Sequence, residues 1–261
     1  MITAASNSRI KRLVQLNQKS KLRRTEDVFL AEGVKMFLEA PREQLQEVYV
    51  SESFLEKCSC REHLGEAGYE VVSDSVFSKI SDTCTPQGVL CVLKQFHYNI
   101  EEMLRDKAPL FLLLENIQDP GNLGTMLRTG EGAGVSGIIM SRDTVDLYNP
   151  KVIRSTMGSI YRVPFYYADD FAAAVHQVQQ AGVSVYAAHL RGKNSYACQD
   201  YTKGTAFLIG NEGNGLREET AELADCYIRI PMEGKVESLN AAVASSILMY
   251  EAHRQRATIE K

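Results

Sequence analysis

The 261-residue sequence lacks any apolar run long enough to cross a membrane. Its longest apolar runs have the length of a strand, such as LFLLL over 110–114, whereas a membrane-spanning helix needs about 20 apolar residues. The first residues also lack the apolar core of a secretory signal and read SNSRIKRLVQL over 6–16. We therefore expect a cytoplasmic protein with no membrane partner.

The sequence also lacks a clustered set of metal ligands. Its six cysteines are irregularly spaced in a chain that is neither short nor typical of secreted proteins, so we expect reduced thiols. Cys58, Cys60 and His63 form a C-x-C-x-x-H group, but a zinc site needs a fourth ligand and no second cluster follows. We expect no metal.

Acidic residues are absent from the first 24 positions, although the whole chain has a net charge of −4. The basic residues there are Arg9, Lys11, Arg12, Lys19, Lys21, Arg23 and Arg24. This pattern is typical of a surface that binds phosphates, or of a solvated helix face, and both readings stay open. No aromatic residue is interleaved for base stacking, so a folded polyanion fits better than a single strand.

The order of predicted elements indicates two α/β domains. Residues 1–95 read as a small unit with a basic helix over 6–20 and strands over 28–32, 47–51, 69–73 and 88–94, and residues 96–108 form a polar linker. Residues 109–261 alternate strands with helices. The strands are expected at 110–115, 136–140, 183–188, 205–210 and 226–230, and the helices at 122–132, 149–157, 169–181, 216–223 and 238–255. Continuous apolar strands predict a parallel sheet covered on both faces, with ligands beyond its carboxyl ends, after 115, 210 and 230.

The loop after the first of these strands reads NIQDPGNLGTMLRTG over 116–130. We expect Asn122 to cap the helix, Leu123, Met126 and Leu127 to face the sheet, and Arg128 to point away from it. The segment has no G-x-x-x-x-G-K-[ST] phosphate loop, and GEGAG over 130–134 falls at the end of the helix rather than directly after a strand. A nucleotide-dependent Rossmann enzyme is therefore disfavoured.

Two later loops carry further polar groups. LIGNEGNGL over 208–216 places Glu212 among three glycines, which permit close backbone approach to a ligand. IRIPMEGKVESLNAAVASS over 228–246 leads into the last helix, for which we expect Ser238 as the cap. Taken alone, Ser238 and Asn240 are better explained as capping residues.

The three loops, in this order, resemble motifs 1, 2 and 3 of the SpoU family of RNA ribose 2′-O-methyltransferases, within the SPOUT superfamily. NPKVIRSTMGSIYRVPF over 149–165 resembles the segment between motifs 1 and 2. Residues 1–94 resemble, more weakly, the L30e-like substrate-binding domain that often precedes this catalytic domain. Motif 3 departs from many members in having alanines after Asn240 in place of a valine and a serine.

The resemblance implies a catalytic domain with a C-terminal trefoil knot, a homodimer with active sites near its interface, and S-adenosylmethionine as methyl donor. The implied cofactor-binding residues are Leu208, Gly210, Ile230, Met232 and Leu239, and the implied catalytic residues are Asn122, Arg128, Glu212, Ser238 and Asn240. Arg128 is the activator proposed in the family. Because a guanidinium stays protonated near neutral pH, a phosphate clamp that orients the hydroxyl is the physically safer role.

The implied substrate is a ribose 2′-hydroxyl of structured RNA. We favour 23S ribosomal RNA, at a guanosine. The alternatives are transfer RNA, or a non-catalytic RNA-binding or ribosome assembly factor with the same fold. The residues expected to contact RNA are Arg9, Lys11, Arg12, Lys21, Arg23, Arg24 and Arg154.

Overall fold

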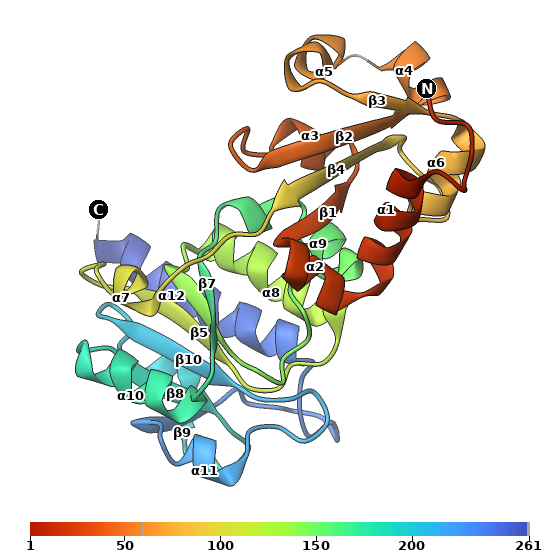
Figure 1. The fold of residues 1–261 in the computed structure, drawn as a ribbon. Coiled ribbons are helices and arrows are strands. Elements are labelled where there is room, and N and C mark those ends of the chain that lie inside the picture. The colour runs from red at the N-terminus through yellow and green to blue at the C-terminus, as the bar shows by residue number, and fades with distance from the viewer. Residues whose placement is uncertain (59, 260–261) are drawn as a thin grey trace. The chain divides into compact units, whose positions relative to one another are not determined.

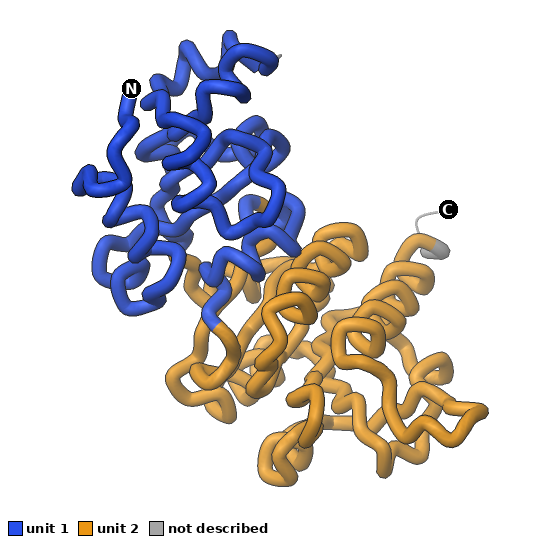
Figure 2. Tube along the Cα trace, turned by 90° about the vertical axis from the view of Figure 1, so that its right-hand side faces the viewer, with its two compact units in different colours: residues 1–96, 146–161 blue, residues 97–145, 162–261 orange. Residues whose placement is uncertain are grey.

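The computed structural model describes residues 1–58 and 60–259, which form two compact units (Figure 2). The first unit contains residues 1–96 and 146–161, and the second contains residues 97–145 and 162–261. The segment 146–161, which follows a strand of the second unit, thus belongs by its contacts to the first. Nothing in the strand and helix alternation of the sequence indicated this exchange.

The first unit is built on a four-stranded mixed sheet in the order β1-β4-β2-β3. Strands β1 and β2 pair with β4 antiparallel, and β3 pairs with β2 parallel. The strands are β1 (Val28–Glu32), β2 (Leu45–Ser51), β3 (Glu70–Val72) and β4 (Val89–Lys94). The helices are α1 (Ser8–Gln18), α2 (Ser20–Glu26), α3 (Val34–Leu38), α4 (Glu52–Lys57), α5 (Arg61–Ala67), α6 (Asp74–Ile80) and α9 (Pro150–Thr156). All four predicted strands are present.

The predicted basic helix over 6–20 is two helices. Asn7 caps α1, with its side chain accepting from the Arg9 amide, and Ile10, Leu13 and Leu16 bury one face. Lys19 then adopts an extended backbone (φ −117°, ψ 104°), which ends α1 and starts α2. The basic residues are therefore divided between two helices. Helix α4 was not predicted. Helix α5 corresponds to a helix that the sequence predicts around 59–67, of which residue 59 lies outside the described residues.

The second unit contains a seven-stranded sheet in the order β7-β6-β5-β10-β8-β11-β9, and every pairing is parallel (Figure 1). This confirms the expected parallel sheet. The strands are β5 (Leu110–Leu114), β6 (Gly137–Ser141), β7 (Phe165–Ala168), β8 (Ser184–Ala188), β9 (Asn194–Ser195), β10 (Thr205–Ile209) and β11 (Cys226–Arg229). Strands β7 and β9 at the two edges were not predicted.

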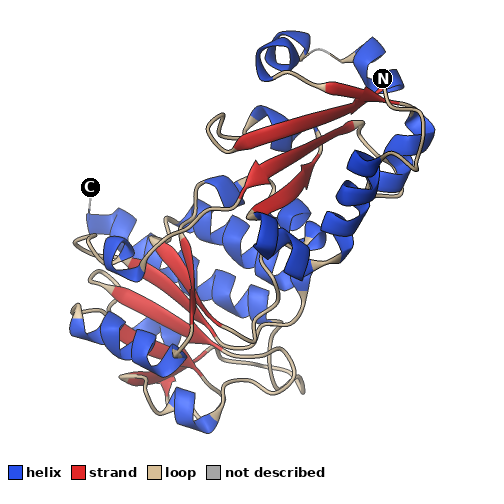
Figure 3. Ribbon diagram, viewed as in Figure 1, coloured by secondary structure: helices blue, strands red, loops and turns tan. Residues whose placement is uncertain are grey.

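Helices cover both faces of this sheet (Figure 3). They are α7 (Ile100–Met103), α8 (Pro120–Ala133), α10 (Phe171–Gln180), α11 (Glu218–Ala221) and α12 (Ala241–Ile259). Phe111 and Leu113 of β5 join the core beneath α7 and α10. Strand alternation turns Leu112 and Leu114 to the opposite face, where α12 packs against β5, β10 and α8. The predicted polar linker is thus partly helical, because Ile100 and Met103 reach this core.

Candidate active site at the carboxyl edge of the parallel sheet

Helix α8 begins two residues before the predicted cap. Its N-cap is Asp119, whose side chain accepts from the Asn122 amide at 2.8 Å. Asn122 as the cap was therefore wrong. Pro120 explains the shift, since its fixed φ suits the first helical position and it has no amide to satisfy. The Asn122 side chain is left available for other contacts.

Asn122 joins all three predicted motifs. Its Nδ2 donates to Glu212 Oε1 at 3.0 Å, and its Oδ1 accepts from Asn240 Nδ2 at 3.0 Å. The Oδ1 of Asn240 in turn accepts from the amides of Ala242 and Val243, so Asn240 caps α12. Ser238 as the cap was wrong, because the chain becomes helical only at Ala241.

The Glu212 carboxylate is the centre of this group. Its Oε1 accepts from the Asp119 amide at 3.0 Å as well as from Asn122, and its Oε2 accepts from the Gln118 amide at 3.1 Å and from Asn211 Nδ2 at 3.5 Å. Burial raises the pKa of Glu212, but the hydrogen bonds from Asn122, Asp119 and Gln118 outweigh it and lower the pKa overall. Such a carboxylate suits a clamp between two loops better than a proton acceptor.

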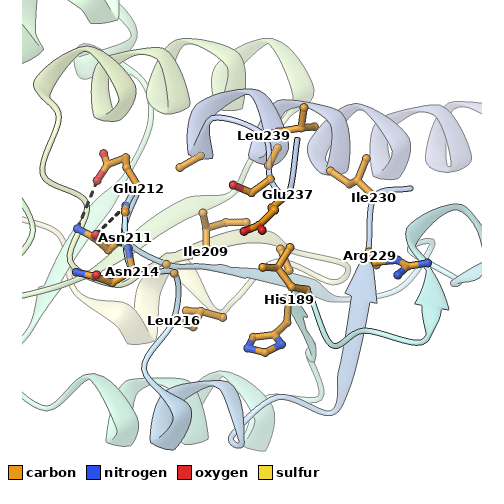
Figure 4. A pocket seen from close by; sticks show the side chains of 18 of the residues that line it. His189, Ile209, Asn211, Glu212, Asn214, Leu216, Arg229, Ile230, Glu237 and Leu239 are labelled. Carbon is orange, nitrogen blue, oxygen red and sulfur yellow. Dashed lines mark hydrogen bonds between the residues drawn. The ribbon is translucent and has the colours of Figure 1, made fainter. Parts of the chain in front are cut away.

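A cavity of about 320 Å³ opens beside this clamp (Figure 4). Three stretches of chain line it, at residues 188–190, 209–216 and 228–244. Its wall combines apolar side chains such as Ile209 and Leu239 with the glycine-rich backbone of 210–215. Its size and mixed lining are those of a small-molecule site, in the predicted place beyond the carboxyl ends of the strands.

Four of the five predicted cofactor-binding residues line this cavity, and one does not. Gly210, Ile230, Met232 and Leu239 line it, and so do Glu212 and Ser238. Leu208 does not, because it is fully buried in β10 and faces the core under α10. Asn122 and Asn240 lie outside the lining and reach it through Glu212.

Five polar side chains of the lining were not among the predicted site residues. They are His189, Asn211, Asn214, Arg229 and Glu237 (Figure 4). His189 directly follows β8, so the rule that ligands lie beyond strand ends would have found it. Burial, and then the nearby Arg191, lower the pKa of His189. Its Nδ1 lies 3.2 Å from the Arg191 amide, which makes Nδ1 an acceptor and leaves the ring proton of the neutral form on Nε2.

Arg128 is exposed on α8, as predicted, while Leu123, Met126 and Leu127 are buried. It lies six positions after Asn122, which places the two about 120° apart around the helix and about 9 Å apart along it. Within the described residues, no hydrogen bond or ion pair joins Arg128 to the Glu212 clamp. In the part of the chain that the structure describes, the exposed Arg128 guanidinium has no hydrogen-bond or ion-pair partner.

The basic residues of the first unit fall into distinct environments. Arg23 is only 2% exposed and bonds the Leu16 and Asn17 carbonyls and Asp146, so it does not fit the expected contact with RNA. Arg9, Arg12 and Arg154 are engaged in ion pairs with acidic side chains. Among the described residues, Lys11, Lys21 and Arg24 are exposed and have no such partner.

No helix in the described part of the chain is long and apolar enough to span a membrane. No group of three or more histidine, cysteine or acidic side chains within that part is arranged to hold a metal ion.

Comparison with known protein families gives two matches along the chain. Residues 109–250 match the SpoU rRNA methylase family, and residues 7–91 match the MRM3-like substrate binding domain.

Individual relatives cover almost the whole sequence. The chain is 32% identical to the 23S rRNA (guanosine(2553)-2′-O)-methyltransferase RlmP of Bacillus subtilis, over 95% of this chain and 97% of that protein. An AdoMet-bound rRNA methyltransferase structure from Sinorhizobium meliloti superposes with a TM-score of 0.84 at 31% identity, covering 97% of each chain. The AviRb SpoU methyltransferase from Streptomyces viridochromogenes, in complex with AdoMet, has a TM-score of 0.87 at 25% identity and covers 97% of this chain and 99% of its own.

Proposed function

Because this chain belongs to the SpoU rRNA methylase family, we propose that it methylates a ribose 2′-hydroxyl of 23S ribosomal RNA, at a guanosine, using S-adenosylmethionine. The observation that carries the proposal is the hydrogen-bonded chain Glu212–Asn122–Asn240 beside the cavity. It brings the three motif loops together at one edge of the sheet. The relative RlmP, whose name specifies a 23S rRNA guanosine, supports the choice of substrate.

The cavity residues fit the methyl donor. Ile209, Ile228 and Leu239 provide apolar contact for an adenine ring, and the backbone of 210–215 provides hydrogen-bonding groups. Arg229 and Glu237 supply one charge of each sign for an amino-acid moiety. When bound, S-adenosylmethionine supplies a methyl group on a sulfonium, which leaves as a neutral thioether.

The chain's own residues have to place the ribose hydroxyl in line with that methyl group. Glu212 is not the base, because its two oxygens already accept four hydrogen bonds. Its role is to hold the start of α8 against residues 210–217, the cavity loop. Arg128, exposed and unpaired among the described residues, clamps the phosphate beside the target ribose and orients the hydroxyl.

Two copies of the chain form the working enzyme in this proposal. Val243 and Tyr250 of α12 are large and about half exposed (48% and 49%), next to the small residues Ala244 and Ser246. An apolar helix face of this kind is buried favourably against a second copy. In such a dimer, Arg128 of one copy acts at the active site of the other copy. A trefoil knot around the cavity and a cytoplasmic location complete the proposal.

The first unit binds the RNA through Lys11, Lys21 and Arg24. These cations are exposed on α1 and α2, whereas the neighbouring arginines already have acidic or carbonyl partners. When an unpaired cation binds an RNA phosphate, counterions are released and no ion pair within the protein has to be broken.

The decisive experiment maps ribose methylation across total RNA in a deletion strain, complemented with the wild type or with Arg128→Ala. We expect one guanosine of 23S RNA to lose its methyl group on deletion and regain it only with the wild type. The Arg128→Ala protein should still bind S-adenosylmethionine in calorimetry. If the methyl group lost on deletion lies in transfer RNA, the substrate is transfer RNA rather than 23S rRNA. If the wild type does not bind the methyl donor, a non-catalytic RNA-binding factor is favoured.

A further inference from the structure

Glu115 is a buried carboxylate that the reaction itself does not use. It directly follows the apolar strand β5 and is only 2% exposed. Burying a carboxylate is costly unless several donors satisfy it. Its position and its partners therefore need an explanation.

The donors to Glu115 come from Arg217, at the end of the cavity loop (residues 210–217), and from Thr220 in α11. Its Oε2 accepts from the Arg217 amide at 2.8 Å, and its Oε1 accepts from Thr220 Oγ1 at 2.5 Å. The Arg217 guanidinium lies 3.5 Å from Oε1 and also pairs with Asp143, which follows β6. The carboxylate thus fixes the point at which the loop turns into α11.

The other end of the same loop is fixed to the same segment. Asn211 donates to the Asn116 carbonyl at 2.8 Å, and Glu212 accepts from the Gln118 and Asp119 amides. Between these anchors the loop closes on itself, with mutual backbone hydrogen bonds between Asn211 and Gly215. These external anchors of residues 211–217, together with the bond from Asn122 to Glu212, lead to 115–122 or to Asp143.

We propose that Glu115 is a positioning residue for binding of the methyl donor. It acts through Arg217 and Thr220, which set the place of the backbone of 211–216 in the cavity wall. This inference rests on the proposed function, because it assigns the cavity to S-adenosylmethionine. Glu212 holds the cavity loop against α8, the helix that carries Arg128. Glu115 holds the other end of the same loop, which forms the wall of the cofactor cavity.

The kinetic test compares Glu115→Gln, Thr220→Val and the control Glu222→Gln, an exposed acid that ends α11. We expect KM for S-adenosylmethionine to rise roughly tenfold in Glu115→Gln, as for loss of a hydrogen bond to a charged group, with kcat nearly unchanged. Thr220→Val should show a smaller rise in KM, and the control none. A fall in kcat at unchanged KM in both variants would overturn the proposal.

A second measurement needs no ligand and no activity. The amides of Asn211, Gly213, Asn214 and Gly215 are hydrogen-bonded within the loop, so their hydrogen exchange reports on its order. Exchange there should accelerate in Glu115→Gln while α8 keeps its protection, and unchanged loop exchange would refute the positioning role. If Glu115→Gln does not fold, Thr220→Val carries both tests. A wild type that binds no methyl donor would defeat the proposed function, while the exchange result would still decide what Glu115 positions.

Discussion

Replacing Glu212 by glutamine tests the central clamp of the site. The side chain keeps its shape, but one carboxylate oxygen becomes an NH₂ group. Each oxygen of Glu212 faces two donors, so either orientation of the amide sets an NH₂ against two N–H groups. Loss of hydrogen bonds to a charged group costs about 1.5–3 kcal/mol each. Because Glu212 is partly exposed, we take about 3 kcal/mol for the whole change, which is roughly 150-fold in a rate or binding constant.

The assay is kcat/KM for methyl transfer to the RNA substrate, with Glu233→Gln as control. Glu233 is exposed on the loop before α12 and does not line the cavity. We expect Glu212→Gln to lose about two orders of magnitude and the control to behave as wild type. The double variant with Asn122→Ala should be little worse than either single variant, because both changes break the same contact. Wild-type turnover by Glu212→Gln, or strictly additive losses, would refute the clamp.

Three further outcomes follow from the same geometry. Gly210→Ala should abolish binding of S-adenosylmethionine in calorimetry, because its Cβ would collide with the backbone of Gly215 and Leu216; undiminished affinity would contradict this packing. Lys21→Ala should reduce the steepness of log K against log salt concentration for RNA binding by about one. Arg9→Ala removes a cation that is already paired with Glu70 and should reduce this slope less. Equal effects of the two variants would contradict the distinction between unpaired and ion-paired cations. Burial raises the pKa of Glu212, but its hydrogen bonds lower it more strongly. The stabilisation that the Glu212 carboxylate gives to the folded loop is therefore complete above the unfolded-state pKa, and it is lost as pH falls through the lower folded-state pKa. Methyl-donor affinity should therefore stay level from neutral pH down to about pH 5 and decline below about pH 4, and a decline centred near pH 6 would point instead to a histidine.

The parts of the fold that were predicted correctly are those with strong local patterns. Runs such as Leu110–Leu114 and Thr205–Ile209 are apolar throughout, which identifies central parallel strands without knowledge of their neighbours. The short edge strand β9 has two residues and no such pattern, so it was missed. The predicted helix starts at Asn122 and Ser238 were wrong because several polar residues stood near each boundary, and Pro120 and Asn240 decided which of them became the cap.

The site was predicted as a set of loops rather than as an arrangement of atoms. The motifs identified Asn122, Glu212 and Asn240, but only the structure joins their side chains in one hydrogen-bonded chain. Leu208 and Arg23 were chosen by position and by charge. Their burial depends on the packing of distant segments, which the local sequence does not report.

The sequence by itself determined the fold class, the family and the loops that carry the chemistry, because strand hydrophobicity, glycine placement and ordered motifs are local properties. Tertiary structure alone decided that residues 146–161 belong to the first unit, and that Glu115 and Glu212 anchor one loop at its two ends. The two loop anchors depend on contacts between residues about 90 to 105 positions apart, and the segment 146–161 depends on contacts such as that between Arg23 and Asp146, which are 123 positions apart. No local propensity encodes such contacts, and they exist only once the strands have paired and their carboxyl ends lie side by side.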